Sequence, residues 1–191
     1  MNTFIHLNKI NEDHIRFTKK GIHVVFFYNL SGKYTFEVAE SGIELYLFGL
    51  FTGKKADNFQ IETVQRHTAP GSLSDLLIKG VFEEDSRFIY QGLIRLEKDA
   101  QQSHAYQKNQ NLILSSEVFV DSRPFLEILA NDVFCTHGST TGKLNKDQLY
   151  YAESRGISKE DAIIMMKEGF INELYFKIAN KVPQFELPNY A

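Results

Sequence analysis

The sequence contains little cysteine, proline or glycine and no tryptophan. Its one cysteine, Cys135, excludes an internal disulfide and any structural zinc site built from several thiolates, and leaves a single thiol for shared or transient ligation. Four prolines and twelve glycines make up about 8% of the 191 residues, below the roughly 12% of average composition. This scarcity argues against a disordered or linker-rich chain.

Net charge and long apolar runs are also small. The chain has 21 Lys and Arg against 24 Asp and Glu, a formal charge of -3, which excludes the broad basic surface of a duplex-binding protein. The longest near-apolar run, Leu45 to Phe51, is far shorter than the ~20 residues of a membrane-spanning helix, and the first residues do not open a signal-peptide pattern. We therefore expect a cytoplasmic protein with neither a nucleic-acid nor a membrane partner.

Aromatic residues are abundant, with 16 Phe and 9 Tyr, and both types favour strands. From Ile22 to about Leu144 the apolar residues alternate or form short solid runs broken by turn residues, which predicts a mainly β fold. One apolar face is especially regular: Phe88, Tyr90, Gly92, Ile94 and Leu96. The segment 78–82 is also echoed twelve residues later by 90–94, a rhythm that suits a β-solenoid but also a sandwich or barrel.

After Leu144 the pattern becomes helical. Asn145 is an expected N-cap with Gln148 three residues on, and Gly156 is expected to end this first helix. Ser158 is expected to cap a second helix, which Pro183 stops. The apolar positions of that second helix are Ala162, Ile163, Met165, Met166, Phe170, Ile171, Leu174 and Ile178. We therefore divide the chain into a β domain 1–144, a helical hairpin 145–180 and a tail 181–191.

The hairpin resembles a helix-turn-helix in outline, but its charges argue against DNA binding. Between Lys159 and Lys177 there are three lysines, no arginine and four acidic residues. The interpretation we favour is a hairpin docked on the end of the β region. Its Met165–Met166 pair suits either that docking or a protein partner, because methionine adapts to uneven surfaces.

Cys135 and His137 form the most informative local pattern. In an extended strand they project from one face with Cα atoms roughly 6 to 7 Å apart, and a thiolate with an imidazole can bind a borderline metal. Two ligands do not fill a four-coordinate site, so another chain or a labile cluster would have to supply the rest. The alternative is that Cys135 is a small buried hydrophobe and His137 a structural histidine.

Enzymatic chemistry is not favoured. A Cys–His hydrolase needs a third group to orient the histidine, and the nearby Asp132 lies on the opposite strand face, so this chemistry is a poor fit. The sequence has no His-x-His pair of a cupin-type metal site and no phosphate-binding Gly-x-x-x-x-Gly-Lys loop. His67 and His104 are isolated, and we expect each to be structural or exposed.

From about His67 to Leu174 the sequence resembles the C-terminal half of the SufB/SufD family, the scaffold proteins of SUF-system iron–sulfur cluster assembly. Several short stretches carry the resemblance by their order and spacing over more than half of the chain. They are His67-Thr68-Ala69-Pro70, Lys79-Gly80-Val81, Tyr90-Gln91-Gly92, Asn111-Leu112-Ile113-Leu114-Ser115, Pro124-Phe125-Leu126-Glu127-Ile128, the run from Asn131 to Gly142, Asp147-Gln148-Leu149-Tyr150-Tyr151 and Ser154-Arg155-Gly156-Ile157.

The resemblance implies a short right-handed parallel β-helix followed by a small helical domain, and a protein with no enzymatic activity of its own. It implies that a SufC-like ABC ATPase binds the helical domain, and that two SufB/SufD-like chains pair through their β-helix ends as a homodimer or heterodimer. The partner-binding residues we expect are Tyr150, Tyr151, Arg155, Met165 and Met166. The metal ligands we expect are Cys135 and His137, for iron or an iron–sulfur cluster held transiently and not bound tightly by the isolated chain.

Two departures from the family bear on this hypothesis. The position of the essential cysteine of the SufB branch falls near Val118, which cannot ligate iron, whereas the Cys-x-His-Gly pattern at 135–138 resembles the SufD branch. The chain is also shorter than typical members and lacks most of their N-terminal region. The competing hypothesis is therefore a β-solenoid interaction module that docks the ATPase but handles no metal.

Overall fold

The computed structural model describes residues 3–183, in which a long series of strands precedes two helices. The strands are β1 (Thr3–His6), β2 (His14–Phe17), β3 (Gly21–Tyr28), β4 (Gly32–Val38), β5 (Ile43–Gly53), β6 (Asn58–His67), β7 (Leu73–Phe82), β8 (Arg87–Leu96), β9 (His104–Ile113), β10 (Phe119–Ile128) and β11 (Phe134–Lys143). The helices are α1 (Lys146–Ser154) and α2 (Lys159–Lys181), and a 3-10 turn covers Leu7–Lys9. Within residues 3–183, neither helix combines the length and the hydropathy that crossing a membrane requires.

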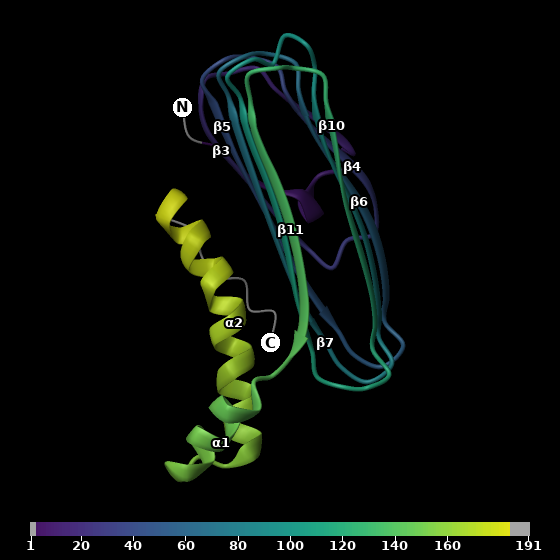
Figure 1. Cartoon of the computed structure of the whole chain (residues 1–191), viewed down its shortest axis with the longest axis vertical. Helices are drawn as coiled ribbons and strands as arrows, with labels where there is room; N and C mark the ends of the chain where they lie inside the picture. Colours follow the sequence, from purple (N-terminus) through teal and green to yellow (C-terminus); the bar gives the residue numbers. More distant parts are fainter. Residues whose placement is uncertain (1–2, 184–191) are drawn as a thin grey trace.

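The strands alternate between two parallel sheets, as in a β-solenoid. Odd-numbered strands form a six-stranded sheet in the order β1-β3-β5-β7-β9-β11, and even-numbered strands form a five-stranded sheet in the order β10-β8-β6-β4-β2. Figure 1 shows the two sheets facing each other along the whole β region, with α2 lying outside the six-stranded sheet. The predicted parallel β-helix followed by a helical hairpin is confirmed.

The core lies between the two sheets and is filled by the inward face of each strand. The predicted apolar face of β8 is this face, since Phe88, Tyr90, Ile94 and Leu96 have no exposed surface. Many phenylalanine rings pack against one another there, for example Phe88 stacked on Phe82, with ring centroids 5.0 Å apart. This packing of aromatic rings in the core accounts for the abundance of phenylalanine.

Strands β5 and β7 are buried on both faces because α2 covers the outside of the six-stranded sheet. The prediction that the hairpin docks on the end of the β region is therefore wrong, since the outer face of this sheet is itself apolar (Figure 1). Leu174 and Ile178 of α2 pack on Phe48 and Leu77 of these strands, forming a second apolar cluster outside the main core. The solid apolar run from Leu45 to Phe51 therefore fills the core with one set of alternate residues and contacts α2 with the other. A strand covered on both faces loses its alternating pattern.

The helix boundaries follow the predicted caps. The Asn145 side chain accepts hydrogen bonds from the backbone amides of Asp147 and Gln148, and Ser158 accepts one from Asp161. α2 ends at Lys181, just before Pro183. The predicted tail 181–191 lies outside the described residues from position 184 onward.

Two features differ from the sequence pattern. The strands begin at Thr3, well before Ile22, because β1 and β2 are too short to give a clear alternation. The twelve-residue echo is not the repeat of the solenoid, since it relates β7 to β8, which lie in opposite sheets. Residues stacked in register, such as Glu44, Leu73, His104 and Phe134, are instead 29, 31 and 30 residues apart.

Candidate functional site

The last coil of the β-helix leaves a layer of core residues uncovered. Strands β10 and β11 are the final strands of their sheets, and each has a neighbour on one side only within residues 3–183. Leu126 and Ile128 of β10 align with the fully buried Ile94 and Leu96 of β8, yet they are 38% and 41% exposed. We call this surface, made of the inward-facing residues of β10 and β11, the open coil end. Uncovered coil ends of this kind favour pairing with a further chain.

Cys135 and His137 lie on β11 at the open coil end, facing inward. In register they align with Ala105 and Gln107 of β9, both of which are buried in the core. Cys135 packs against the small apolar cluster of Ala105 and Ile94, and this burial raises the pKa of its thiol to about 11. His137 is exposed. At neutral pH the chain therefore presents an accessible imidazole beside a protonated thiol, which must lose its proton before it can bind a metal.

The remaining ligands of a metal site are not gathered around this pair. Within residues 3–183, no group of three or more His, Cys, Asp or Glu side chains is arranged to hold a metal ion. The assignment of Cys135 and His137 as metal ligands therefore stays a prediction. It requires that a second chain or the cluster itself complete the coordination.

A groove between α1 and the start of α2 brings together four of the five predicted partner-binding residues. It has a volume of about 540 Å³, and its lining includes Tyr151, Arg155, Met165 and Met166. The Arg155 guanidinium lies over the Tyr151 ring, 5.2 Å from its centroid. We call this surface the hairpin groove. Tyr150 is 74% exposed and lies outside the groove lining.

An ion pair that the sequence did not reveal fastens α2 to the β-helix. Lys79 lies on the outer face of β7 with only 1% of its side chain exposed. Its ammonium donates hydrogen bonds to the Phe170 carbonyl (2.7 Å) and to Glu173 Oε2 (2.5 Å), and it lies 4.1 Å from the centroid of the Phe170 ring. Because the partners are more than ninety residues away in sequence, only the interruption of an apolar strand by a lysine could have signalled this contact.

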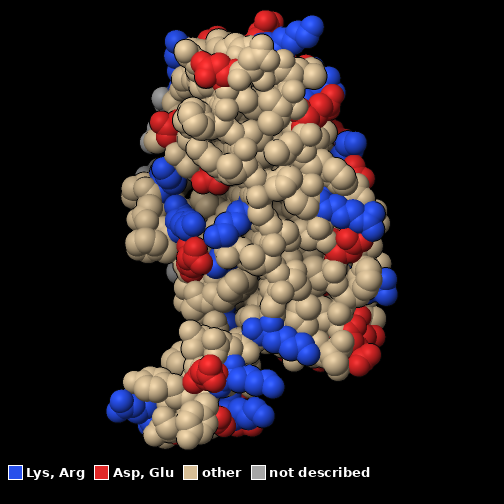
Figure 2. Space-filling view, viewed as in Figure 1, with Lys and Arg blue, Asp and Glu red and all other residues tan. Residues whose placement is uncertain are grey.

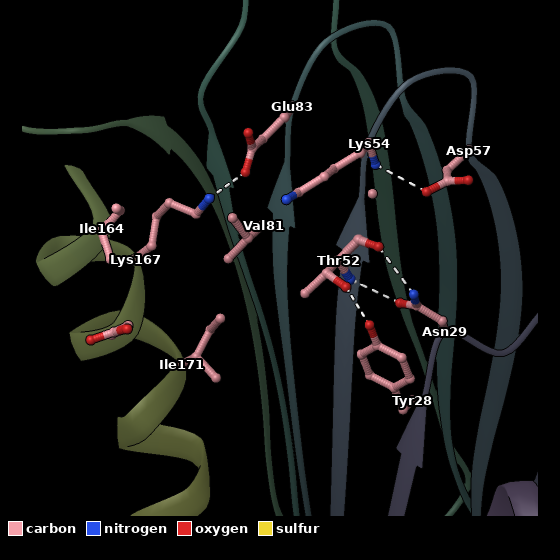
Figure 3. A pocket seen from close by; sticks show the side chains of 12 residues that line it. Tyr28, Asn29, Thr52, Lys54, Asp57, Val81, Glu83, Ile164, Lys167 and Ile171 are labelled. Atoms are coloured by element: carbon pink, nitrogen blue, oxygen red, sulfur yellow. Dashed lines mark hydrogen bonds and ion pairs between the residues drawn. The ribbon is translucent and has the colours of Figure 1, made fainter. Parts of the chain in front are cut away.

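A second ion pair between α2 and the β-helix lies at the edge of a pocket near the turns that follow β3, β5 and β7 (Figure 3). The pocket has a volume of about 530 Å³, and Lys167 of α2 forms an ion pair with Glu83 across its edge. On the opposite wall the Tyr28 and Thr52 hydroxyls are hydrogen-bonded at 2.5 Å, and the Lys54 side chain points inward. Together with the Lys79–Glu173 pair, this contact sets the orientation of the hairpin groove relative to the β-helix.

His67 is structural, as its isolation in the sequence suggested. It has no exposed surface, and its two ring nitrogens lie 2.8 Å from the hydroxyl oxygens of Ser72 and Ser74. Burial lowers the pKa of His67 from 6.5 to about 4, so the folded protein holds the ring neutral.

We expect His67 to make the β-helix sensitive to acid. The unfolded chain takes up a proton near pH 6.5 and the folded chain only near pH 4, so the contribution of the neutral ring is complete above pH 6.5. It is lost as the pH falls toward 4, by up to about 3 kcal/mol. Urea unfolding between pH 7.5 and 4.5 should show a smaller decline for His67→Gln than for the parent. Parallel curves for the two proteins would contradict this assignment.

Comparison with known proteins gives a consistent result. The family model described as SUF system FeS cluster assembly, SufBD core domain, matches residues 25–170. The iron-sulfur cluster assembly protein SufD of Escherichia coli K12 is 37% identical over 98 residues, which cover 51% of this chain and 23% of that protein. SufD of Bacillus subtilis 168 is 32% identical over 126 residues, covering 64% of this chain and 28% of the relative.

A longer match is to an iron-sulfur cluster assembly SufBD family protein of Mycobacterium leprae. It is 31% identical over 146 residues, which cover 72% of this chain and 37% of that protein. The chain therefore spans less than two fifths of the length of these relatives. The shared part includes most of the β-helix and, in the family model, the first half of α2.

Proposed function

Because the chain belongs to the SufB/SufD family and is SufD-like, we propose that it is a non-enzymatic scaffold subunit for iron–sulfur cluster assembly. In this role it pairs with a second SufB/SufD-like chain through the open coil end and docks a SufC-like ABC ATPase on the hairpin groove. The iron or cluster is cargo, held transiently where the two chains meet. We place this assembly in the cytoplasm.

The observation that carries the proposal is the position of His137. It lies on the last strand, beside core residues that the chain leaves uncovered, so a second chain that covers the coil end also reaches the imidazole. An interface can supply the ligands that one chain lacks. Cys135 can join the site only if partner contact or bound iron favours its thiolate, since burial raises the pKa of this thiol.

The hairpin groove has the composition of a docking surface. It combines an aromatic ring, an arginine and two methionines, which are enriched at protein interfaces. Met165 is 50% exposed and Tyr151 is 61% exposed, so both are accessible in the isolated chain. The Lys79–Glu173 and Lys167–Glu83 ion pairs connect α2 to the β-helix, so they would couple a movement of the bound ATPase to the β-helix.

A second candidate function keeps the docking and discards the metal. The sequence has Val118 near the place of the SufB-type cysteine, and Cys135 is partly buried with a raised pKa. Both observations favour an interaction module that handles no iron.

One experiment separates these functions. The chain is co-expressed anaerobically with a SufC-like ATPase and a SufB-like chain, captured by a tag, and assayed for bound partners, iron and sulfide. We expect His137→Ala to retain both partners and to lose most of the iron, because an exposed imidazole contributes little to folding. We expect Met165→Asp to lose the ATPase and to retain the SufB-like chain, because the carboxylate would lose its hydration when the ATPase covers the groove.

The two variants serve as controls for each other, since each should lose one property and keep the other. Substitutions are preferable to deleting the hairpin, because deletion would uncover the apolar outer face of β3, β5 and β7. Normal iron in the complex containing His137→Ala would favour the interaction module. Retention of the ATPase by Met165→Asp would place the docking surface elsewhere.

A further inference from the structure

A pocket of about 410 Å³ lies on the outer face of the six-stranded sheet, against the last turns of α2. Its walls come from β5, β7, β9 and the helix, and Phe48 and Leu77 contribute apolar surface. The pocket is separate from both surfaces described above. The open coil end is formed by inward-facing residues, and the hairpin groove lies at the opposite end of α2.

Three lysines line this pocket. Lys108 comes from β9, while Lys177 and Lys181 are one helical turn apart on α2. Figure 2 shows basic side chains gathered where the upper half of α2 meets the sheet. Lys177 also lies 3.4 Å from Glu173, the carboxylate that holds Lys79. These four ammonium groups lie near three carboxylates, Asp75, Glu173 and Glu44, so positive charge is in slight excess in a chain whose net charge is negative.

The pocket also contains a carboxylate, Asp75, that has no hydrogen-bonding partner among residues 3–183. It lies on the outer face of β7 and lines the pocket, and within residues 3–183 it forms neither a hydrogen bond nor an ion pair. Burial raises the pKa of Asp75, although Lys177, Lys181 and Lys108 are near enough to oppose this shift. Asp75 is partly buried, and a partly desolvated carboxylate that accepts no hydrogen bond is destabilising. The pocket keeps Asp75 and the lysines apart, and a ligand that fills it can bind both.

Two tyrosines form aromatic walls of the pocket and are held in position. The Tyr46 hydroxyl donates to Glu44 Oε2 at 2.9 Å, and the Lys181 ammonium lies 3.9 Å from the centroid of the Tyr46 ring. The Tyr106 hydroxyl lies 3.3 Å from the His104 ring nitrogen Nδ1. Glu44 reduces the local positive charge, so the best ligand carries one or two negative charges.

We propose that this pocket binds a small phosphate ester that carries free hydroxyl groups. The phosphate lies among Lys108, Lys177 and Lys181, which act as point-charge phosphate ligands. A hydroxyl group donates its hydrogen bond to Asp75, as a ribose hydroxyl does to an acidic residue in nucleotide sites. The remainder of the ligand lies against Tyr46 and Tyr106. Sugar phosphates and mononucleotides share this chemistry, and the inference goes beyond the proposed assembly role.

The proposal is tested by titrating the full chain with ribose 5-phosphate, AMP, inorganic phosphate and ribose, monitored by calorimetry and by NMR. We expect the two esters to bind at least about 10-fold more tightly than inorganic phosphate, because only they satisfy Asp75. Ribose should not bind at concentrations near 10 mM, because it lacks the charge that the lysines recognise. Tighter binding of AMP than of ribose 5-phosphate would identify the ligand as a nucleotide, and the reverse order would identify it as a sugar phosphate.

Two variants test the two halves of the site. Lys108→Ala should weaken ester binding several-fold, whereas Lys159→Ala should not, because Lys159 lies ~30 Å away at the other end of α2. Asp75→Leu should remove the preference for esters over inorganic phosphate while leaving the thermal stability equal or higher, because it deletes an unpartnered carboxylate. Equal binding of esters and inorganic phosphate by the parent would overturn the proposal. So would unchanged ester affinity in Lys108→Ala, or no binding at all.

Discussion

Replacing Gly80 by alanine is expected to lower the free energy of unfolding by about 3 kcal/mol, because the inward position it occupies on β7 has no room for a Cβ atom. The added methyl group would overlap the Phe82 ring and would lie 2.7 Å from the Asn111 side-chain oxygen. Phe82 cannot move aside, since it is fully buried and stacks on Phe88 with centroids 5.0 Å apart. Asn111 is held by a 2.7 Å hydrogen bond to Asn109.

Urea unfolding at neutral pH measures this effect, with Gly138→Ala as the matched control. Gly138 also lies within a strand, but the space around it is open, so a methyl group there should change stability by less than about 0.5 kcal/mol. If the two variants lost equal stability, the aromatic stack would be able to repack around the added atom. The role assigned to Gly80 would then be wrong.

The sequence predicts those parts of the fold that depend on local patterns. The alternation along β8 identifies its buried face correctly, and Asn145 and Ser158 cap the two helices as expected. These features depend on residues within a few positions of one another. The solenoid required the family resemblance, because alternating strands are equally compatible with a sandwich or barrel.

Contacts between distant residues could not be predicted in this way. The sequence of β7 does not reveal that Lys79 meets Glu173, nor that the Phe82 ring occupies the space above Gly80. The same limit applies to the candidate sites. Spacing places Cys135 and His137 on one strand face, but only the structure shows that the thiol packs into the core while the imidazole is exposed at the open coil end.

Removing the Glu173 carboxylate is expected to loosen α2 from the β-helix. In Glu173→Ala the Lys79 ammonium loses its carboxylate partner and keeps the hydrogen bond to the Phe170 carbonyl and the contact with the Phe170 ring. Breaking a fully buried ion pair by removing one partner costs roughly 3 to 5 kcal/mol. Because the Glu173 side chain is 47% exposed, water screens part of the interaction, and we expect a loss of about 2 kcal/mol. Hydrogen exchange should locate the loss in α2, with faster exchange of its amides.

Adding Lys79→Met to Glu173→Ala should restore most of the lost stability, because the second substitution removes the unpaired charge and leaves an apolar chain of similar length against Phe170. Lys79→Met alone should be nearly neutral, since the remaining Glu173 carboxylate is half exposed and also contacts Lys177. Stability losses that simply add in the double variant would mean that the ion pair contributes nothing. The apolar contacts of Leu174 and Ile178 and the Lys167–Glu83 ion pair would then hold α2 without it. Rescue by methionine would instead mean that the unpaired buried ammonium is what weakens the docking of α2, so a partner that draws Glu173 away would loosen the helix.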